Sequence, residues 1–240
     1  TGAPVVVPAG RRVTGRGRLE GAFDCRGALQ ASAGHGLDMT GSIVLGDGGV
    51  IDLVGEGLGQ FDQDDIIFGQ GRLLITGTAS RIDGGLLNAR HIGVGRDGVG
   101  RIVQNGGEVC GASMTLARSD AGDGVYEMHD GTLDLQGGDL YVGYIHSQYP
   151  DPVGGVGVLA LHGGRIDAGR LFAGSKLAHA DTSRVAIHGG RLEVEDLSRI
   201  GWNQGRCQYV QTGGTFHTDE LEFWNTVVDL RGGLIESNGF

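Results

Sequence analysis

Short segments in which apolar and polar residues alternate recur along the chain, and each lies beside a Gly-Gly or Asp-Gly step. The final glycine of the step falls at eight positions: Gly49, Gly85, Gly107, Gly131, Gly164, Gly190, Gly214 and Gly233. Two residues after these glycines stand apolar side chains in every copy: Ile51, Leu87, Val109, Leu133, Ile166, Leu192, Phe216 and Ile235. Alternation with a period of two predicts half-buried β-strands, so this column predicts one repeated strand with an inward face.

Two further alternating segments accompany the glycine step. Apolar pairs come five and three residues before it: Tyr126 and Met128, Leu159 and Leu161, Val185 and Ile187, Val228 and Leu230. Other pairs come seven and nine residues after it: Ile92 and Val94, Met114 and Leu116, Leu171 and Ala173, Leu221 and Phe223. The repeated unit therefore contains three short strands.

A unit of three short strands cannot bury its own apolar face, but stacked copies about 4.8 Å apart merge their columns into one core. Glycine suits the corner because it adopts positive φ and allows close backbone approach. We therefore expect an all-β chain that forms a right-handed parallel β-helix. It has three short strands per coil of about 22–26 residues, and roughly 9–10 coils in a single domain, 1–240.

The coils are not expected to be uniform. Residues 1–45 are predicted to be N-terminal coils, with residues 4–8 as a capping or exchanged strand, and 46–240 to be regular coils. A loop excursion is expected at 145–156, because Pro150 and Pro152 preclude ladder pairing. The long interval between Gly49 and Gly85 either carries a loop over residues 57–65 or conceals a degenerate coil.

Composition supports this fold and excludes several alternatives. The 240 residues include 49 Gly but only 4 Pro, which excludes collagen, and 39% are hydrophobic, which excludes a disordered chain. The net charge of −10 argues against nucleic acid or an anionic membrane surface as a partner. No apolar stretch approaches the roughly 18 residues of a membrane span. Cys25, Cys110 and Cys207 lack metal-ligand spacing and allow at most one intrachain disulfide.

The coils resemble those of a known group of proteins. The N-terminal ones read VPAGRRVTGRGRLEGAF, GALQAS and GLDMTGSIVLGDGGVIDL, and later steps read NGGEV, HGGRID, HGGRLEV and TGGTF. These stretches resemble secreted bacterial β-helix proteins, namely autotransporter passenger domains and surface proteins with autotransporter-associated β-strand repeats. The resemblance covers essentially the whole chain and reflects coil geometry more than a shared active site. It implies a protein that is secreted or lies on the surface of a bacterium.

Three histidines fall at one position of successive coils. His129, His162 and His188 each stand two residues before a corner glycine, so a ladder would hold them about 5 Å apart. Such a column either binds a transition metal or forms part of an outward polar ladder. The second interpretation is supported by the polar residues at the same position in other coils: Asp47, Asp83, Asn105, Thr212 and Arg231.

Acidic residues, including Asp134, Asp167 and Glu193, form a column three residues after the corner glycine. Like charges in neighbouring rungs repel unless cations bridge them or the side chains splay into water. Calcium is one interpretation, but the calcium-solenoid nonapeptide GGxGxDxUx is not met, because residues such as Ile166 and Leu192 replace its third glycine. We expect no cofactor.

Catalytic candidates are few. Gln63-Asp64-Asp65 and Gly34-His35-Gly36 resemble motifs of β-helix polygalacturonases, in which paired carboxylates protonate the leaving oxygen and activate water. Here His35 precedes Asp64 and Asp65, the reverse of that family's order, and partners for its Asn-Thr-Asp and Arg-Ile-Lys elements are missing. We therefore expect no enzymatic activity.

Aromatic residues are expected to gather at one corner of the C-terminal half. Tyr144, Trp202 and Trp224 fall 13, 12 and 10 residues after their corner glycines. An exposed aromatic strip would bind sugars or pack against another subunit. Alternatively, these side chains cover the mouth of the coil or pack under the Tyr149 loop.

Terminal coils of a solenoid leave backbone edges that invite pairing with another chain. No helical period of ten or more residues indicates a cap, so we expect either a longer array or copies stacked head to tail. Val5, Val6 and Val7 would then complete a neighbour's open coil by β-addition, next to Ile235 and Phe240. The expected function is an extracellular structural solenoid that forms a surface filament or adhesin. The alternatives are a polysaccharide-binding module or, third, a β-helix polysaccharide lyase or hydrolase.

Overall fold

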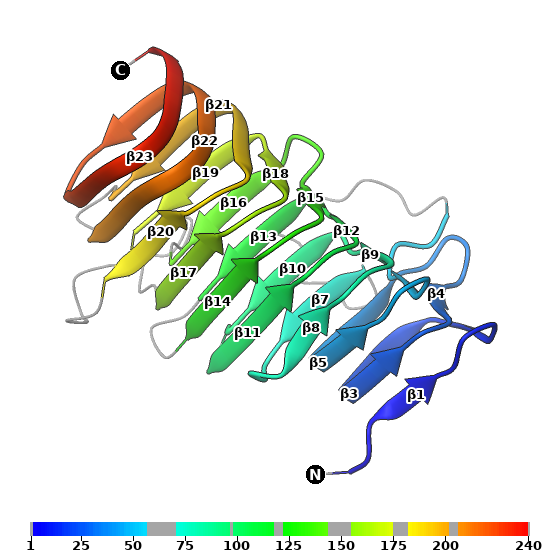
Figure 1. The fold of residues 1–240 in the computed structure, drawn as a ribbon. Coiled ribbons are helices and arrows are strands. Elements are labelled where there is room, and N and C mark those ends of the chain that lie inside the picture. The colour runs from blue at the N-terminus through cyan, green and yellow to red at the C-terminus, as the bar shows by residue number, and fades with distance from the viewer. Residues whose placement is uncertain are drawn as a thin grey trace.

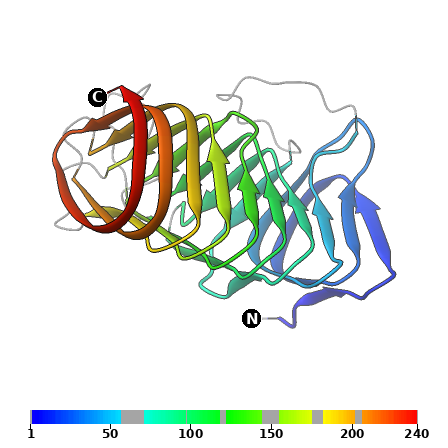
Figure 2. The ribbon, with the colours of Figure 1, turned by 45° about the horizontal axis from the view of Figure 1, so that its top comes forward.

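The computed structural model describes seven parts of the chain: residues 2–56, 71–96, 98–117, 122–143, 155–174, 182–201 and 206–239. Every regular element in these parts is a β-strand, and every pair of neighbouring strands is parallel. The strands wind around a common axis as stacked coils, from β1 (Val5–Val7) at one end to β23 (Thr226–Gly239) at the other (Figures 1 and 2). The predicted all-β parallel β-solenoid is confirmed.

Each coil places one strand on each of three faces. The first face, before the glycine corner, contains β1, β8 (Ser80–Ile82), β11 (Val99–Gln104), β14 (Asp123–Met128), β17 (Val156–Leu161) and β20 (Ser183–Ile187). The second face, after that corner, contains β2 (Arg12–Gly15), β4 (Ala28–Ala31), β6 (Val50–Asp52), β9 (Leu86–Asn88), β12 (Glu108–Cys110), β15 (Thr132–Asp134) and β18 (Arg165–Ala168). The third face contains β7 (Arg72–Ile75), β10 (His91–Val94), β13 (Ser113–Leu116), β16 (Asp139–Val142) and β19 (Arg170–Ala173).

Five longer strands turn corners without interruption. They are β3 (Gly17–Cys25) and β5 (Leu37–Leu45), from the third face to the first; β21 (Arg191–Ile200), from the second to the third; β22 (Cys207–Phe223), across all three; and β23, which begins on the first. β1 pairs with β3 of its own chain, so residues 5–7 form the first rung of this solenoid.

The strand register shows that both long intervals are single coils. Ile51 pairs directly with Leu87, and Leu133 pairs directly with Ile166. No described strand intervenes, so the interval between Gly49 and Gly85 does not contain a degenerate coil. Residues 57–65, and residues 145–154 of the predicted excursion, lie outside the described parts.

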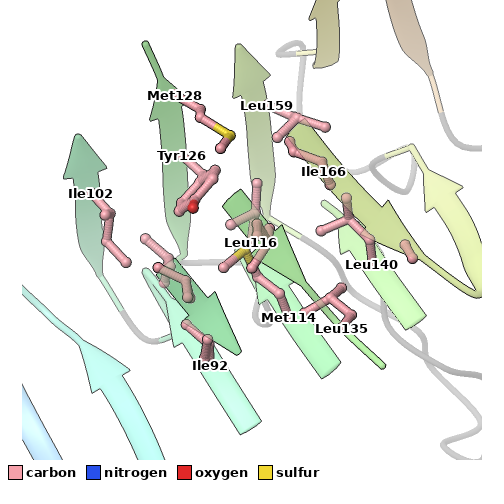
Figure 3. Close-up of a cluster of buried hydrophobic side chains, with 14 of the residues drawn as sticks. Ile92, Ile102, Met114, Leu116, Tyr126, Met128, Leu135, Leu140, Leu159 and Ile166 are labelled. Carbon is pink, nitrogen blue, oxygen red and sulfur yellow. The ribbon is translucent and has the colours of Figure 1, made fainter. Parts of the chain in front are cut away.

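The core consists of the predicted inward columns. Seven of the eight apolar residues that follow the corner glycines are completely buried, and the eighth, Ile235, is partly buried in the terminal rung. Figure 3 shows how residues from successive rungs pack together inside the coil, with Ile102, Tyr126 and Leu159 from the first face near Met114 and Leu140 from the third. Stacking therefore creates the continuous core that a single coil lacks.

Buried glutamines interrupt this apolar core at two places on the first face. Gln104 and Gln211 are at most 1% exposed. Each accepts a hydrogen bond from a tyrosine hydroxyl, Tyr126 for Gln104 and Tyr209 for Gln211, and each donates through Nε2 to backbone carbonyls at the corner. Their polar atoms are thus hydrogen-bonded, which removes most of the cost of burying an amide.

The corner glycines are needed for close approach as well as for conformation. Gly190 has a φ of 69°, in the left-handed region. A Cβ atom there would lie 2.6 Å from the carbonyl oxygen of Gly164 in the preceding coil. That oxygen accepts the hydrogen bond of Arg191 N at 3.0 Å, so the corner also carries a link between rungs. A side chain at this position would push two coils apart.

Candidate functional site

The histidine ladder lies at the corner between the first and second faces, where β14, β17 and β20 end. The rings of His129 and His162 stack with centroids 4.7 Å apart and 10° between their planes. Those of His162 and His188 stack at 5.0 Å and 24°. The spacing of parallel rungs sets these distances. The structure therefore brings together the three histidines whose alignment the repeat predicts.

A glutamate completes this cluster. Glu127 lies two residues before His129 and projects from the same side of β14, because side chains alternate along a strand. Its Oε1 is 3.1 Å from Nε2 of His129 and 3.6 Å from Nε2 of His162. Arg101 in the preceding coil donates a 2.5 Å hydrogen bond to Oε2. The ligand atoms of Glu127, His129 and His162 all lie within 4.8 Å of one another.

The charges of this cluster favour a neutral imidazole beside an ionised carboxylate. Burial lowers the pKa of His162, and the neighbouring His129 and His188 lower it further, whereas Glu127 acts in the opposite direction. The hydrogen bond from Arg101 holds the pKa of Glu127 below its usual value. These are the protonation states in which both groups ligate a metal.

Other members of the same column form hydrogen bonds between rungs. Asn105 donates to Oδ1 of Asp83 at 2.9 Å, and Nδ1 of His188 lies 2.8 Å from the hydroxyl of Thr212. The column is therefore an outward polar ladder over most of its length. The Glu127 carboxylate distinguishes the His129 and His162 rungs from the rest.

Arginines bridge the acidic column on the second face. Arg165 donates to Asp167 at 2.8 Å and to Glu193 in the next coil at 2.5 Å, and Arg191 also donates to Glu193. Burial raises the pKa of Asp167 above its usual value, with Glu193 acting in the same direction and Arg165 in the opposite one. Asp134 accepts the backbone N–H of Gln136 at 2.7 Å. Arginine side chains thus supply positive charge beside Asp167 and Glu193, the role for which the sequence analysis considered calcium.

Only one of the three catalytic candidates lies within the described residues. His35 is exposed, and its Nε2 lies 3.4 Å from the Arg16 guanidinium. Asp64 and Asp65 lie outside the described parts.

Only one member of the predicted aromatic strip can be placed. Trp224 is 59% exposed, and its indole N–H donates to Glu222 at 3.1 Å. Tyr144 and Trp202 lie outside the described residues, so the strip itself stays a prediction.

An ion pair between a buried carboxylate and a half-exposed arginine, on the outer side of the third face, has no counterpart in the sequence predictions. Asp139 is 2% exposed and accepts two 2.8 Å hydrogen bonds from Arg170, together with a 2.6 Å bond from the hydroxyl of Tyr141. The ring of Tyr141 stacks on Phe172 at 5.5 Å, and the Arg170 guanidinium lies 5.5 Å from the Phe172 ring centroid. Because Asp139 is already satisfied by these donors, we assign the cluster a structural role.

The two terminal rungs expose side chains that are buried in the other coils. At the C-terminal edge Val228 and Leu230 are 41% and 57% exposed, whereas Tyr209 and Gln211, which pair with them in the preceding rung, are buried. At the N-terminal edge Val5 is 53% exposed, whereas its partner Phe23 is buried; Val6, also 53% exposed, lies in the outward column of Asp24. Val7, the third valine predicted to take part in assembly, is buried at 3% exposure, and Phe240 lies outside the described residues.

The terminal regions also carry opposite charge. Residues 1–18 contain four arginines and no acidic residue. Residues 219–239 contain five acidic residues and one arginine. This asymmetry is visible in the sequence once the first and last rungs are known.

The contribution of Glu127 to the histidine ladder was missed from the sequence. Its signal is its position two residues before His129, which places both on one side of a strand. The bridging arginines had a similar signal, since Arg165 and Arg191 each follow a corner glycine in adjacent coils.

Comparisons of the chain with protein-family models, with curated proteins and with solved structures found no match. Within the described parts of the chain, no helix has the length and hydropathy required to cross a membrane.

Proposed function

We propose that this chain is a non-enzymatic, extracellular structural β-solenoid that assembles head to tail. The first coil of one copy stacks on β23 of the next copy. The observation that carries the proposal is the pair of terminal edges, where inward-column side chains are exposed and the charges are opposite. The extracellular and bacterial-surface setting rests on the resemblance of the repeats.

Stacking in register would restore the interior of the solenoid. One further rung would place Val5 of the incoming copy over Val228 and Val7 over Leu230, because these residues belong to the same columns of the first face. A parallel rung would also pair the free backbone groups of β23, and unpaired edges of this kind favour β-addition.

Electrostatics would favour this end-to-end orientation over its alternatives. On the third face Arg18 and Glu220 belong to one column, and only Gly239, which has no side chain, would separate the incoming arginine from this acidic residue. Contact between two N-terminal ends would bring arginines together, and contact between two C-terminal ends would bring acidic residues together. Opposite ends therefore attract, and the contact does not close into a ring of two copies.

Sedimentation velocity over a concentration series tests the proposal. The wild-type protein should associate progressively, and association should weaken as NaCl rises from about 0.1 M to about 1 M, which shortens the Debye length from about 10 Å to about 3 Å. The substitutions Val228→Asp and Leu230→Asp should abolish association, because each places a carboxylate in the contact. They should not disturb the monomer, since both side chains are exposed in the single chain.

A matched control carries a carboxylate on the solenoid side. Val99 is 51% exposed and lies away from both edges, so Val99→Asp should associate like the wild type. A wild-type protein that stays monomeric at high concentration, or an edge variant that associates normally, contradicts stacking between copies.

A further inference from the structure

Glu127, His129 and His162 form a group of potential ligands that the structural function does not use. Oε1 of Glu127 faces Nε2 of both imidazoles, at 3.1 Å and 3.6 Å. All three side chains lie on the outer surface, where water and ions have access, and the two histidines are 44% and 37% exposed. We propose that these three residues bind a zinc-class divalent ion, with water in the remaining coordination position.

The donor set and its separations suit such an ion. Two imidazole nitrogens and one carboxylate oxygen are ligands that Zn²⁺ accepts at about 2.0–2.2 Å, and tetrahedral geometry places neighbouring ligands about 3.3 Å apart. The two nitrogen–oxygen separations of 3.1 Å and 3.6 Å lie on either side of that value. Only the two imidazoles must tilt toward each other, and as exposed side chains at strand ends they are free to do so.

Neighbouring residues orient the ligands. Arg101 holds Oε2 of Glu127, which leaves Oε1 directed toward the imidazoles. His188 stacks on the opposite side of His162 and is itself held near the Thr212 hydroxyl, so it limits the tilt of His162 away from Glu127. Groups that hold a ligand in position in this way typically change metal affinity about 10–100-fold.

A bound ion would join two adjacent coils from outside. His129 follows β14 and His162 follows β17, strands that pair in register but are separated by one of the longest intervals of the chain. Since the unfolded chain does not hold these ligands together, binding would stabilise the folded state by linkage.

The experiment uses the untagged protein with ZnCl₂ as the probe, in a buffer that does not chelate metals. Isothermal titration should give one zinc per chain, and thermal unfolding should shift upward with zinc concentration. CaCl₂ and MgCl₂ should have no such effect, because both ions prefer all-oxygen sites. X-ray absorption of the zinc complex should show two nitrogen ligands and at least one oxygen ligand.

Variants assign the ligands. His162→Asn and His129→Asn place in these rungs the residue that Asn105 contributes to the same column, so the ladder should still fold. Each should weaken zinc binding about tenfold or more, as should Glu127→Gln, whereas the remote His217→Asn should retain most of the affinity. Circular dichroism confirms that each variant is folded.

Two results would overturn the proposal. One is a wild-type protein without saturable zinc binding, which needs no variant to interpret. The other is zinc binding that survives Glu127→Gln and His129→Asn but is lost in His188→Asn, which would place the ion elsewhere on the ladder.

Discussion

The corner glycines allow the packing of the coils to be tested by single substitutions. At Gly190 a methyl group meets two obstacles, a φ of 69° and the Gly164 carbonyl oxygen 2.6 Å from the new Cβ. The left-handed conformation costs a non-glycine residue about 1–2 kcal/mol. Separating the rungs also breaks the hydrogen bond from Arg191 N to that oxygen, and an unsatisfied buried group costs about 1–3 kcal/mol. We therefore expect Gly190→Ala to lower the free energy of unfolding by about 2–5 kcal/mol.

Two other glycines separate these contributions. Gly48 has a φ of 70°, but a Cβ atom added there would have no other atom within 4 Å, so Gly48→Ala should cost only the conformational strain of about 1–2 kcal/mol. Gly189 lies outside the positive-φ region, yet its Cβ would lie 2.3 Å from the His162 carbonyl oxygen. The loss of stability in Gly189→Ala should therefore measure the cost of close approach between coils, without a contribution from backbone conformation.

Chemical denaturation followed by circular dichroism measures all three variants. Gly190→Ala should be the least stable, and its loss should exceed that of Gly48→Ala. Equal losses at Gly190 and Gly48 would show that conformation alone selects glycine at the corner. The account of close approach between coils would then be refuted.

Two further predictions concern the core and the thiols. Phe216→Ala should lower the free energy of unfolding by about 3–5 kcal/mol in the same denaturation assay, because Phe216 is completely buried. Leu234→Ala, at a position that is 51% exposed, should change the free energy of unfolding little. Equal effects would contradict the assignment of Phe216 to the interior of the coil. Burial, the hydrogen bond to Glu108 and nearby acidic charge raise the pKa of Cys110 to about 12. Iodoacetamide should therefore label this thiol slowly at pH 8, and Glu108→Gln should accelerate the labelling. An unchanged labelling rate in Glu108→Gln would count against Glu108 as a cause of the raised pKa.

The solenoid could be predicted from sequence because its signals are local and repeated. The glycine step and the apolar residue two positions later, as at Gly190 and Leu192, recur in eight coils and fix both the corner and the inward side. Contacts across the outer surface are different in kind. That Glu127 reaches the imidazole of His162 depends on which outward residues of two coils face each other, 35 positions apart in the chain.

The same reason explains the acidic column. The repulsion between Asp167 and Glu193 was foreseeable from their spacing, but its relief by Arg165 depends on a side chain that reaches across rungs. The direction in which a long side chain extends is set by its neighbours in space and not by the repeat.

Disulfide trapping between copies tests the proposed stacking most directly. Extending the ladder by one rung pairs Val6 of one copy with Asp229 of the next, and adjacent rungs about 4.8 Å apart are within the Cα separation that a disulfide spans. Mixing Val6→Cys with Asp229→Cys under mild oxidation should give the mixed disulfide, and the variant with both substitutions should give a ladder of covalent oligomers. Only intramolecular products or like-with-like dimers would contradict head-to-tail assembly.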